Sequence, residues 1–200
     1  MKKGIIIIII IIICIAGALL LFAGFCVSKY NGLVEAEAAV DQKWANVESQ
    51  YQRRADLIPN LVATVKGYAE HEESTLQAVT DARTRATSMT IDPATATPEQ
   101  MQQWMAAQDE LSSALGRLIA VAESYPDLKA NQNFLQLQAQ LEGTENRISV
   151  ERQNYNEAVK EYNVNVRKFP NNIIASMFGF ETKSMFEANA GAEVAPVVVF

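Results

Sequence analysis

The sequence predicts an all-α protein, in which an N-terminal transmembrane helix is followed by an antiparallel up-and-down helical bundle. Three observations lead to this prediction. Residues 5–27 form an almost unbroken apolar run in a chain of 200 residues. The rest of the chain repeats apolar residues at alternating spacings of three and four, the period of helices packed along a seam. The chain has only 9 glycines and 6 prolines, which are few for a turn-rich β fold.

The apolar run starts with nine consecutive isoleucines, Ile5–Ile13, and continues to Val27. As a helix it would rise about 34 Å, slightly more than the ~30 Å hydrocarbon core of a bilayer. In lipid, only a helix satisfies every backbone group within one segment. The apolar part of a signal peptide is shorter, about 7–15 residues. We therefore predict a retained anchor, with signal cleavage or lipidation at Cys26 as the alternatives.

The charge flanking the run predicts the topology. Lys2 and Lys3 precede it, and the positively charged flank of a membrane helix stays in the cytoplasm. We expect residues 1–4 in the cytoplasm, 5–27 in the bacterial inner membrane, a helical bundle over 28–180, and a flexible tail over 181–200. The bundle would then lie on the periplasmic or extracytoplasmic side.

The longest periodic segment of the chain extends from Leu33 to Ala86. Apolar residues occupy twelve of its sixteen seam positions, which predicts a long helix with one packed face. Pro59 lies inside this segment, and a proline removes one backbone donor and clashes with the preceding turn. We expect a kink or a break there, so that the bundle has three long helices, or four if the first breaks at Pro59.

The later helices have recognisable ends. Residues 88–97 lack any period and form a loop, and Thr97-Pro98-Glu99-Gln100 is a capping box with proline at the first helical position. The helix that follows ends before a turn over 124–127. Another extends to about Lys168, where Phe169-Pro170 stops it, and a short apolar helix follows over 173–180.

Four charged residues fall where the seam is expected to be apolar, at Arg54, Glu72, Glu145 and Arg152. One interpretation is a buried polar layer that fixes helix register or partner choice. The other is that these charges lie at the edge of the seam and extend into water. The Tyr-Asn pairs at 155–156 and 162–163 also allow two interpretations: a binding face, or two rings stacked along one seam.

Composition excludes several classes of function. After the first three residues there are 23 acidic and 15 basic residues, a net charge of −8, so we expect no nucleic-acid partner. The only cysteines, Cys14 and Cys26, lie in the apolar run, and His71 is the only histidine. Such a chain cannot build a cysteine-ligated zinc site or a two-histidine di-iron site. We expect no metal, no cofactor and no catalytic residues, with His71 on the surface.

Several stretches of the chain closely resemble the LemA family of bacteria. The resemblance covers nearly the whole chain and is most specific in RRADLIPNLV and YPDLKAN. It implies a single-pass membrane protein with a helical-bundle domain, usually four-helical, and no established enzymatic activity. Some relatives belong to systems that build internal membranes. The stretches that carry the resemblance are residues 30–34, 44–72, 115–148 and 152–163.

Together these observations predict a non-catalytic, membrane-anchored scaffold or membrane-organising protein that forms a homo-oligomer through its helical domain. The alternative is an envelope adaptor that presents clients or signals to another membrane protein, such as a protease or a sensor. The end of the chain, Ala195 to Phe200, is apolar and β-branched. It is either disordered or a strand that adds to a partner, in which case Val198 and Phe200 would make the contact.

Overall fold

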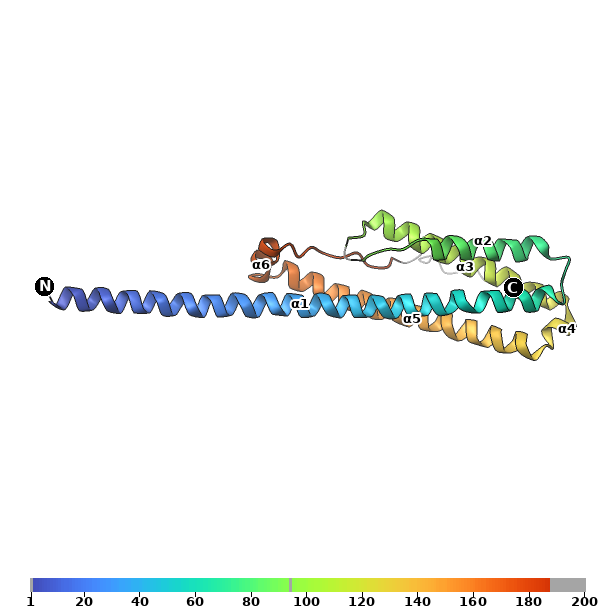
Figure 1. The fold of residues 1–200 in the computed structure, drawn as a ribbon, viewed down its shortest axis with the longest axis horizontal. Coiled ribbons are helices and arrows are strands. Elements are labelled where there is room, and N and C mark those ends of the chain that lie inside the picture. Colours follow the sequence, from blue (N-terminus) through green and yellow to red (C-terminus); the bar gives the residue numbers. More distant parts are fainter. Residues whose placement is uncertain (1, 94, 188–200) are drawn as a thin grey trace, which may run out of the picture. The chain divides into compact units, whose positions relative to one another are not determined.

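A computed structural model of the chain confirms the all-α class. It describes residues 2–93 and 95–187, with side chains from Ile10 onward. Within these residues every regular element is a helix (Figure 1). The candidate tail residues Val198 and Phe200 lie outside the described part. In chain order the elements are α1 (Lys2–Lys66), α2 (Glu73–Ser88), α3 (Pro98–Val121), the 3-10 helix η1 (Ala122–Ser124), α4 (Pro126–Lys129), α5 (Gln132–Arg167) and α6 (Asn171–Phe178).

The chain divides into two compact units. The first comprises residues 1–40 and 160–182, and the second comprises 41–159 and 183–200. The second unit is the helical bundle, formed by the end of α1, by α2 and α3, and by most of α5. Short connections join these helices, so that consecutive ones run antiparallel (Figure 1). Its core joins apolar residues of all four helices, among them Leu61, Val79, Leu118 and Leu141.

The predicted seam of the first long segment is the buried face of α1 and α2. Eleven of its twelve apolar positions are buried, and only Tyr68 is exposed. Tyr68 lies two residues after the end of α1, so the helical spacing no longer places it on the seam. The seam is Leu33, Val40, Trp44, Val47, Tyr51, Ile58, Leu61, Val65, Val79, Ala82 and Ala86.

Of the two outcomes expected at Pro59, a kink or a break, the structure excludes the break. Helix α1 continues through Pro59 to Lys66, and the chain turns over residues 67–72 before α2 starts. Gly67, a poor helix former, marks the end. The bundle therefore has four long helices, but the first separation falls eight residues after Pro59.

A side chain from α2 explains how α1 accommodates its proline. Pro59 has no N–H to donate to the carbonyl of Ala55 one turn earlier. Arg83 fills this vacancy, because its Nε donates to the Ala55 oxygen at 2.8 Å. The cost of an internal proline is thus offset by a hydrogen bond that also joins α1 to α2.

The capping box at the start of α3 is confirmed. Thr97 Oγ1 accepts from the Gln100 backbone N–H at 3.2 Å, and Gln100 Oε1 accepts from the Thr97 N–H at 2.9 Å. Pro98 occupies the first turn, where its missing N–H leaves no bond unmade. This local signal fixes where the third helix of the bundle begins.

The pairing of Arg83 with the proline-released carbonyl can be tested by a double-mutant cycle. In the full chain in detergent, Arg83→Met should lower the free energy of unfolding by about 1–3 kcal/mol, because the Ala55 carbonyl loses its donor. In a Pro59→Ala background the loss should be smaller, since residue 59 then donates to Ala55 itself. Denaturant unfolding followed by circular dichroism measures both, with exposed Arg117→Met as the control. Equal losses in the two backgrounds would contradict the assignment.

Candidate functional site

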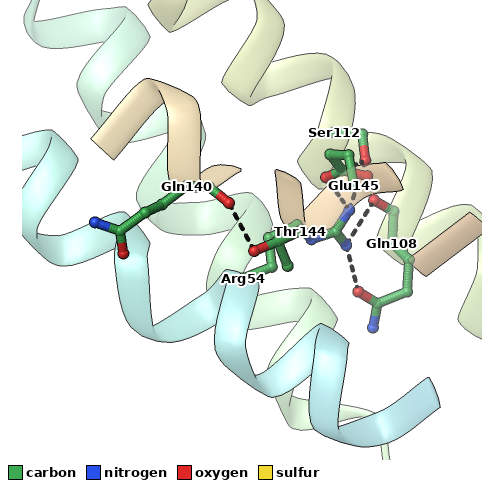
Figure 2. Close-up of polar contacts among 6 residues, drawn as sticks. All are labelled: Arg54, Gln108, Ser112, Gln140, Thr144 and Glu145. Atoms are coloured by element: carbon green, nitrogen blue, oxygen red, sulfur yellow. Dashed lines mark hydrogen bonds and ion pairs between the residues drawn. The ribbon is translucent and has the colours of Figure 1, made fainter. Parts of the chain in front are cut away.

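The most distinctive polar feature of the bundle is a buried arginine. Arg54 is 1% exposed, and its guanidinium extends from α1 to two neighbouring helices (Figure 2). Nη1 donates to Ser112 Oγ at 2.6 Å and to Glu145 Oε1 at 2.7 Å. Nη2 donates to the side-chain oxygen of Gln108 at 2.7 Å and to its backbone oxygen at 3.3 Å. One side chain therefore joins α1, α3 and α5.

The cluster extends to the remaining helix of the bundle through Gln108. The Nε2 of this side chain donates to the carbonyl of Ala86 at 3.1 Å. Ala86 lies in the last turn of α2, where carbonyls have no partner within the helix. Gln108 thus accepts from Arg54 and donates to α2. We call Arg54, Gln108, Ser112 and Glu145 the Arg54 cluster.

Burial of a charged group is expensive unless its donors are paired. Both terminal nitrogens of Arg54 have two acceptors each, whereas its Nε finds no acceptor in the described part of the chain. The ring of Tyr51 lies 5.0 Å from the guanidinium carbon. A carboxylate neutralises the charge, although the Glu145 side chain is 41% exposed. The pair is therefore buried at one end and open to water at the other.

The Arg54 cluster joins helices through hydrogen bonds and one ion pair. Glu145 Oε1 accepts from Arg54 and lies 3.4 Å from Ser112 Oγ, so the serine and the carboxylate are both bonded to the arginine. Thr144, next to Glu145, is buried and donates to the carbonyl of Gln140 on its own helix at 2.7 Å (Figure 2). These bonds hold helices in place.

The other two charged seam residues lie outside this cluster. Glu72 is in the turn between α1 and α2, where it accepts a hydrogen bond from the Tyr125 hydroxyl at 3.2 Å. Arg152 lies over the ring of Phe186, 4.8 Å from its centroid. The structure therefore brings Arg54 and Glu145 together and places Glu72 and Arg152 elsewhere. Pro59, the predicted kink, is one turn beyond Ala55 on α1.

A cluster of aromatic rings forms a second cross-link in the bundle. Trp104 on α3 lies 5.3 Å from Trp44 and 4.8 Å from Tyr51, both on α1. Phe186 stacks on Trp44 at 5.8 Å and meets Tyr155 on α5 at 5.2 Å. Edge and offset contacts of this kind add to the stabilisation that burial alone provides. We call these five rings the aromatic cluster.

Residues 183–186, which fall inside the flexible tail expected over 181–200, are bound to the bundle. Asn156 accepts from the Phe186 N–H at 2.8 Å and donates to its carbonyl at 2.9 Å. The Tyr155 hydroxyl donates to the Ser184 carbonyl at 3.1 Å, and burial raises the pKa of this tyrosine. Lys183, itself buried, lies 3.4 Å from Asp41. The Tyr155-Asn156 pair thus binds residues 184–186 of its own chain.

Sequence reasoning missed the roles of Gln108, Ser112 and Phe186, and it left open what the Tyr155-Asn156 pair does. Gln108 did carry a signal, because it is a polar residue at a seam position of its helix. Ser112 carried none, since its role depends on which helix faces it. Neither His71, which is exposed, nor any group of three histidine, cysteine or acidic residues in the described ranges could hold a metal ion.

The fold and these cross-links define a class of protein: a helical bundle whose first helix starts with a long, fully apolar segment. A family model described as the LemA family matches residues 43–200. The chain belongs to the LemA family.

Individual relatives extend the similarity over most of the chain. It is 26% identical to magnetosome protein MamQ 1 of Paramagnetospirillum magneticum, over 90% of this chain and 72% of that protein. It is 25% identical to magnetosome protein MamQ of Magnetospirillum gryphiswaldense, with the same coverage. Protein LemA of Metamycoplasma hominis is 23% identical, over 82% of this chain and 71% of its own length.

The Arg54–Glu145 pair yields a stability prediction for the full chain in detergent. Breaking a fully buried pair removes about 3–5 kcal/mol, but water reaches Glu145 and screens its charge, so we expect Glu145→Ala to lose about 1–3 kcal/mol. In an Arg54→Met background the same change should have little effect, because no buried charge is left unpaired. Denaturant midpoints measure both.

Glu142 provides the matched control for this experiment. It is exposed and lies on the same helix, one turn before Glu145, so Glu142→Ala should leave the midpoint nearly unchanged. If Glu145→Ala behaves like Glu142→Ala, the pair does not stabilise the bundle.

Proposed function

We propose that this chain is a membrane-anchored, non-catalytic scaffold whose helical domain associates with further copies of itself. The anchor would be the first part of α1, with residues 1–4 in the cytoplasm and the bundle outside the inner membrane. Avidity would be the mechanism, because an anchor confines the copies to two dimensions and raises their effective concentration. A weak lateral contact then becomes sufficient for assembly.

The observation on which this proposal depends is the exposed apolar surface of α1. By length and composition this is the one helix in the described part of the chain able to cross a membrane. Its large apolar side chains from Ile10 to Phe25 are 43 to 79% exposed. No other described part of its unit covers them, and a bilayer would. Helix α1 continues from this segment without a break to Lys66.

The family and the bundle interior support a structural role. Relatives named as magnetosome proteins align with 90% of this chain. The LemA resemblance likewise implies relatives in systems that build internal membranes. Within the described bundle, the buried arginine and its glutamine partner are both used to join helices. A domain cross-linked in this way presents fixed outer surfaces, which a scaffold needs.

The orientation can be checked by protease accessibility. Lys2 and Lys3 keep the N-terminus inside, so a protease added to intact spheroplasts should degrade the bundle, for example in the exposed loop near Met89. A cytoplasmic protein measured in the same samples must stay intact. Protection of the bundle until the cells are lysed would overturn the orientation.

Self-association is tested by the mass of the extracted protein. Cross-linking in the intact membrane, followed by mild detergent extraction and mass measurement, should give a multiple of two or more of the 22.1 kDa chain. A variant without residues 1–27, cross-linked at the same total concentration, should stay monomeric, because it lacks the confinement that the anchor provides. A monomer that co-purifies with a different membrane protein would contradict the scaffold and favour an adaptor role.

A further inference from the structure

A second apolar surface lies in the first unit, on the short helix α6. Phe169 just before α6, with Ile173 and Met177 on it, are 76%, 52% and 73% exposed. Ile173 and Met177 are four residues apart, the spacing that places side chains on one helix face, and Phe169 lies in the turn that precedes the helix. The opposite face, Ile174 and Ala175, is buried at 5% and 2% exposure. Helix α6 is thus apolar on both faces, and its own unit covers only one.

The position of α6 along α1 is fixed by ring contacts. Tyr30 meets Phe178 with ring centroids 4.8 Å apart, and Phe180 at 5.6 Å. The two segments therefore lie side by side at Tyr30 (Figure 1). Tyr30 is three residues beyond Val27, the end of the apolar run, which is a rise of about 4.5 Å along the helix.

This distance corresponds to one layer of a bilayer. The headgroup region on each side of the hydrocarbon is about 5–7 Å thick. If residues 5–27 span the hydrocarbon, Tyr30 lies in the headgroup layer, where tyrosine is favoured. Helix α6 touches Tyr30 and so lies in the same layer.

The charges around α6 suit a lipid surface. Arg167 and Lys168, both exposed, lead directly into Phe169, and Lys29 precedes Tyr30. Glu181 is the acidic residue that follows the helix. Basic side chains at this level bind lipid phosphates while their aliphatic stems lie along apolar surface.

We propose that α6 is an interfacial helix, which inserts Phe169, Ile173 and Met177 into the bilayer at the boundary between headgroups and acyl chains. This inference rests on the proposed anchor. It gives the chain a second contact with the membrane on one side of α1. Such a contact would stop α1 from rotating freely about its axis, and so would present a chosen face of the chain to neighbouring copies.

The test measures the depth of α6 in vesicles of phosphatidylcholine and phosphatidylglycerol. Three full chains, each with one cysteine, carry an environment-sensitive fluorophore: at Cys26 after Cys14→Ser, and at Met177→Cys or Ala38→Cys after both native cysteines become serine. Ala38 is exposed on α1, about 16 Å beyond the apolar run. Lipids with a nitroxide high on the acyl chain act as quenchers.

We expect the label at 177 to be quenched severalfold more than the label at 38, and to an extent close to that at 26. Quenching at 177 as weak as at 38, with strong quenching at 26, would overturn the interfacial helix and leave the anchor intact. Weak quenching at 26 would overturn the anchor, and the inference with it. A blue-shifted but unquenched label at 177 would show that protein, such as a second copy, covers this face.

A variant tests whether the apolar face itself produces the insertion. Phe169→Ser with Ile173→Ser, both at exposed positions, should remove most of the quenching at 177 and leave that at 26 unchanged. Unchanged quenching at 177 would overturn the role of these side chains. Helix content measured by circular dichroism shows that the variant is folded.

Discussion

The pairing of one buried guanidinium determines how the helices of the bundle are aligned. Arg54 is stable in the interior only where Gln108 and Ser112 face it from α3 and Glu145 faces it from α5. Gln108 and Ser112 are four residues apart, so both lie on the same face of α3. A shift of α5 by one turn, about 5.4 Å, would move Glu145 away from the guanidinium, and the same shift of α3 would break the present pairing with Gln108 and Ser112. Apolar seams tolerate such shifts better, since many side chains of similar size can replace one another.

The same constraint explains why α1 can keep a proline in its interior. Once Gln108 holds the last turn of α2 through Ala86, the position of α2 along α1 is fixed. Arg83 on α2 then donates to the Ala55 carbonyl, to which Pro59 has no N–H to donate. Two hydrogen bonds therefore join α2 to its neighbours at neighbouring levels: Gln108 on α3 donates to α2, and Arg83 on α2 donates to α1. The proline remains helical because a tertiary donor replaces the missing local one.

Sequence patterns predicted what depends on one segment at a time. The seam residues, the cap at Thr97 and the apolar run are all local signals, and the structure places them as expected. The chain turns at Gly67 and not at Pro59, because the decisive partner of the proline, Arg83, belongs to another helix. Arg54 and Glu145 were suspected for their polarity at seam positions, but Glu72 and Arg152 showed the same signal and are not in the cluster. What distinguishes Arg54 and Glu145 from Glu72 and Arg152 is which helices face each other in the bundle, and no single segment of the sequence encodes that.

Helix α1 itself records a change of surroundings. From Ile10 to Phe25 its large apolar side chains are exposed on every side, whereas from Leu33 onward most of them form one buried stripe, with Val34 exposed beside it. A helix that is apolar all round matches lipid, and a helix with one apolar stripe matches a protein core in water. The transition falls between Val27 and Leu33, and Tyr30, at its middle, is the residue that α6 contacts. The exposed apolar face of α6 therefore lies where the pattern of α1 indicates that the two environments meet, which is why a single boundary accounts for both helices.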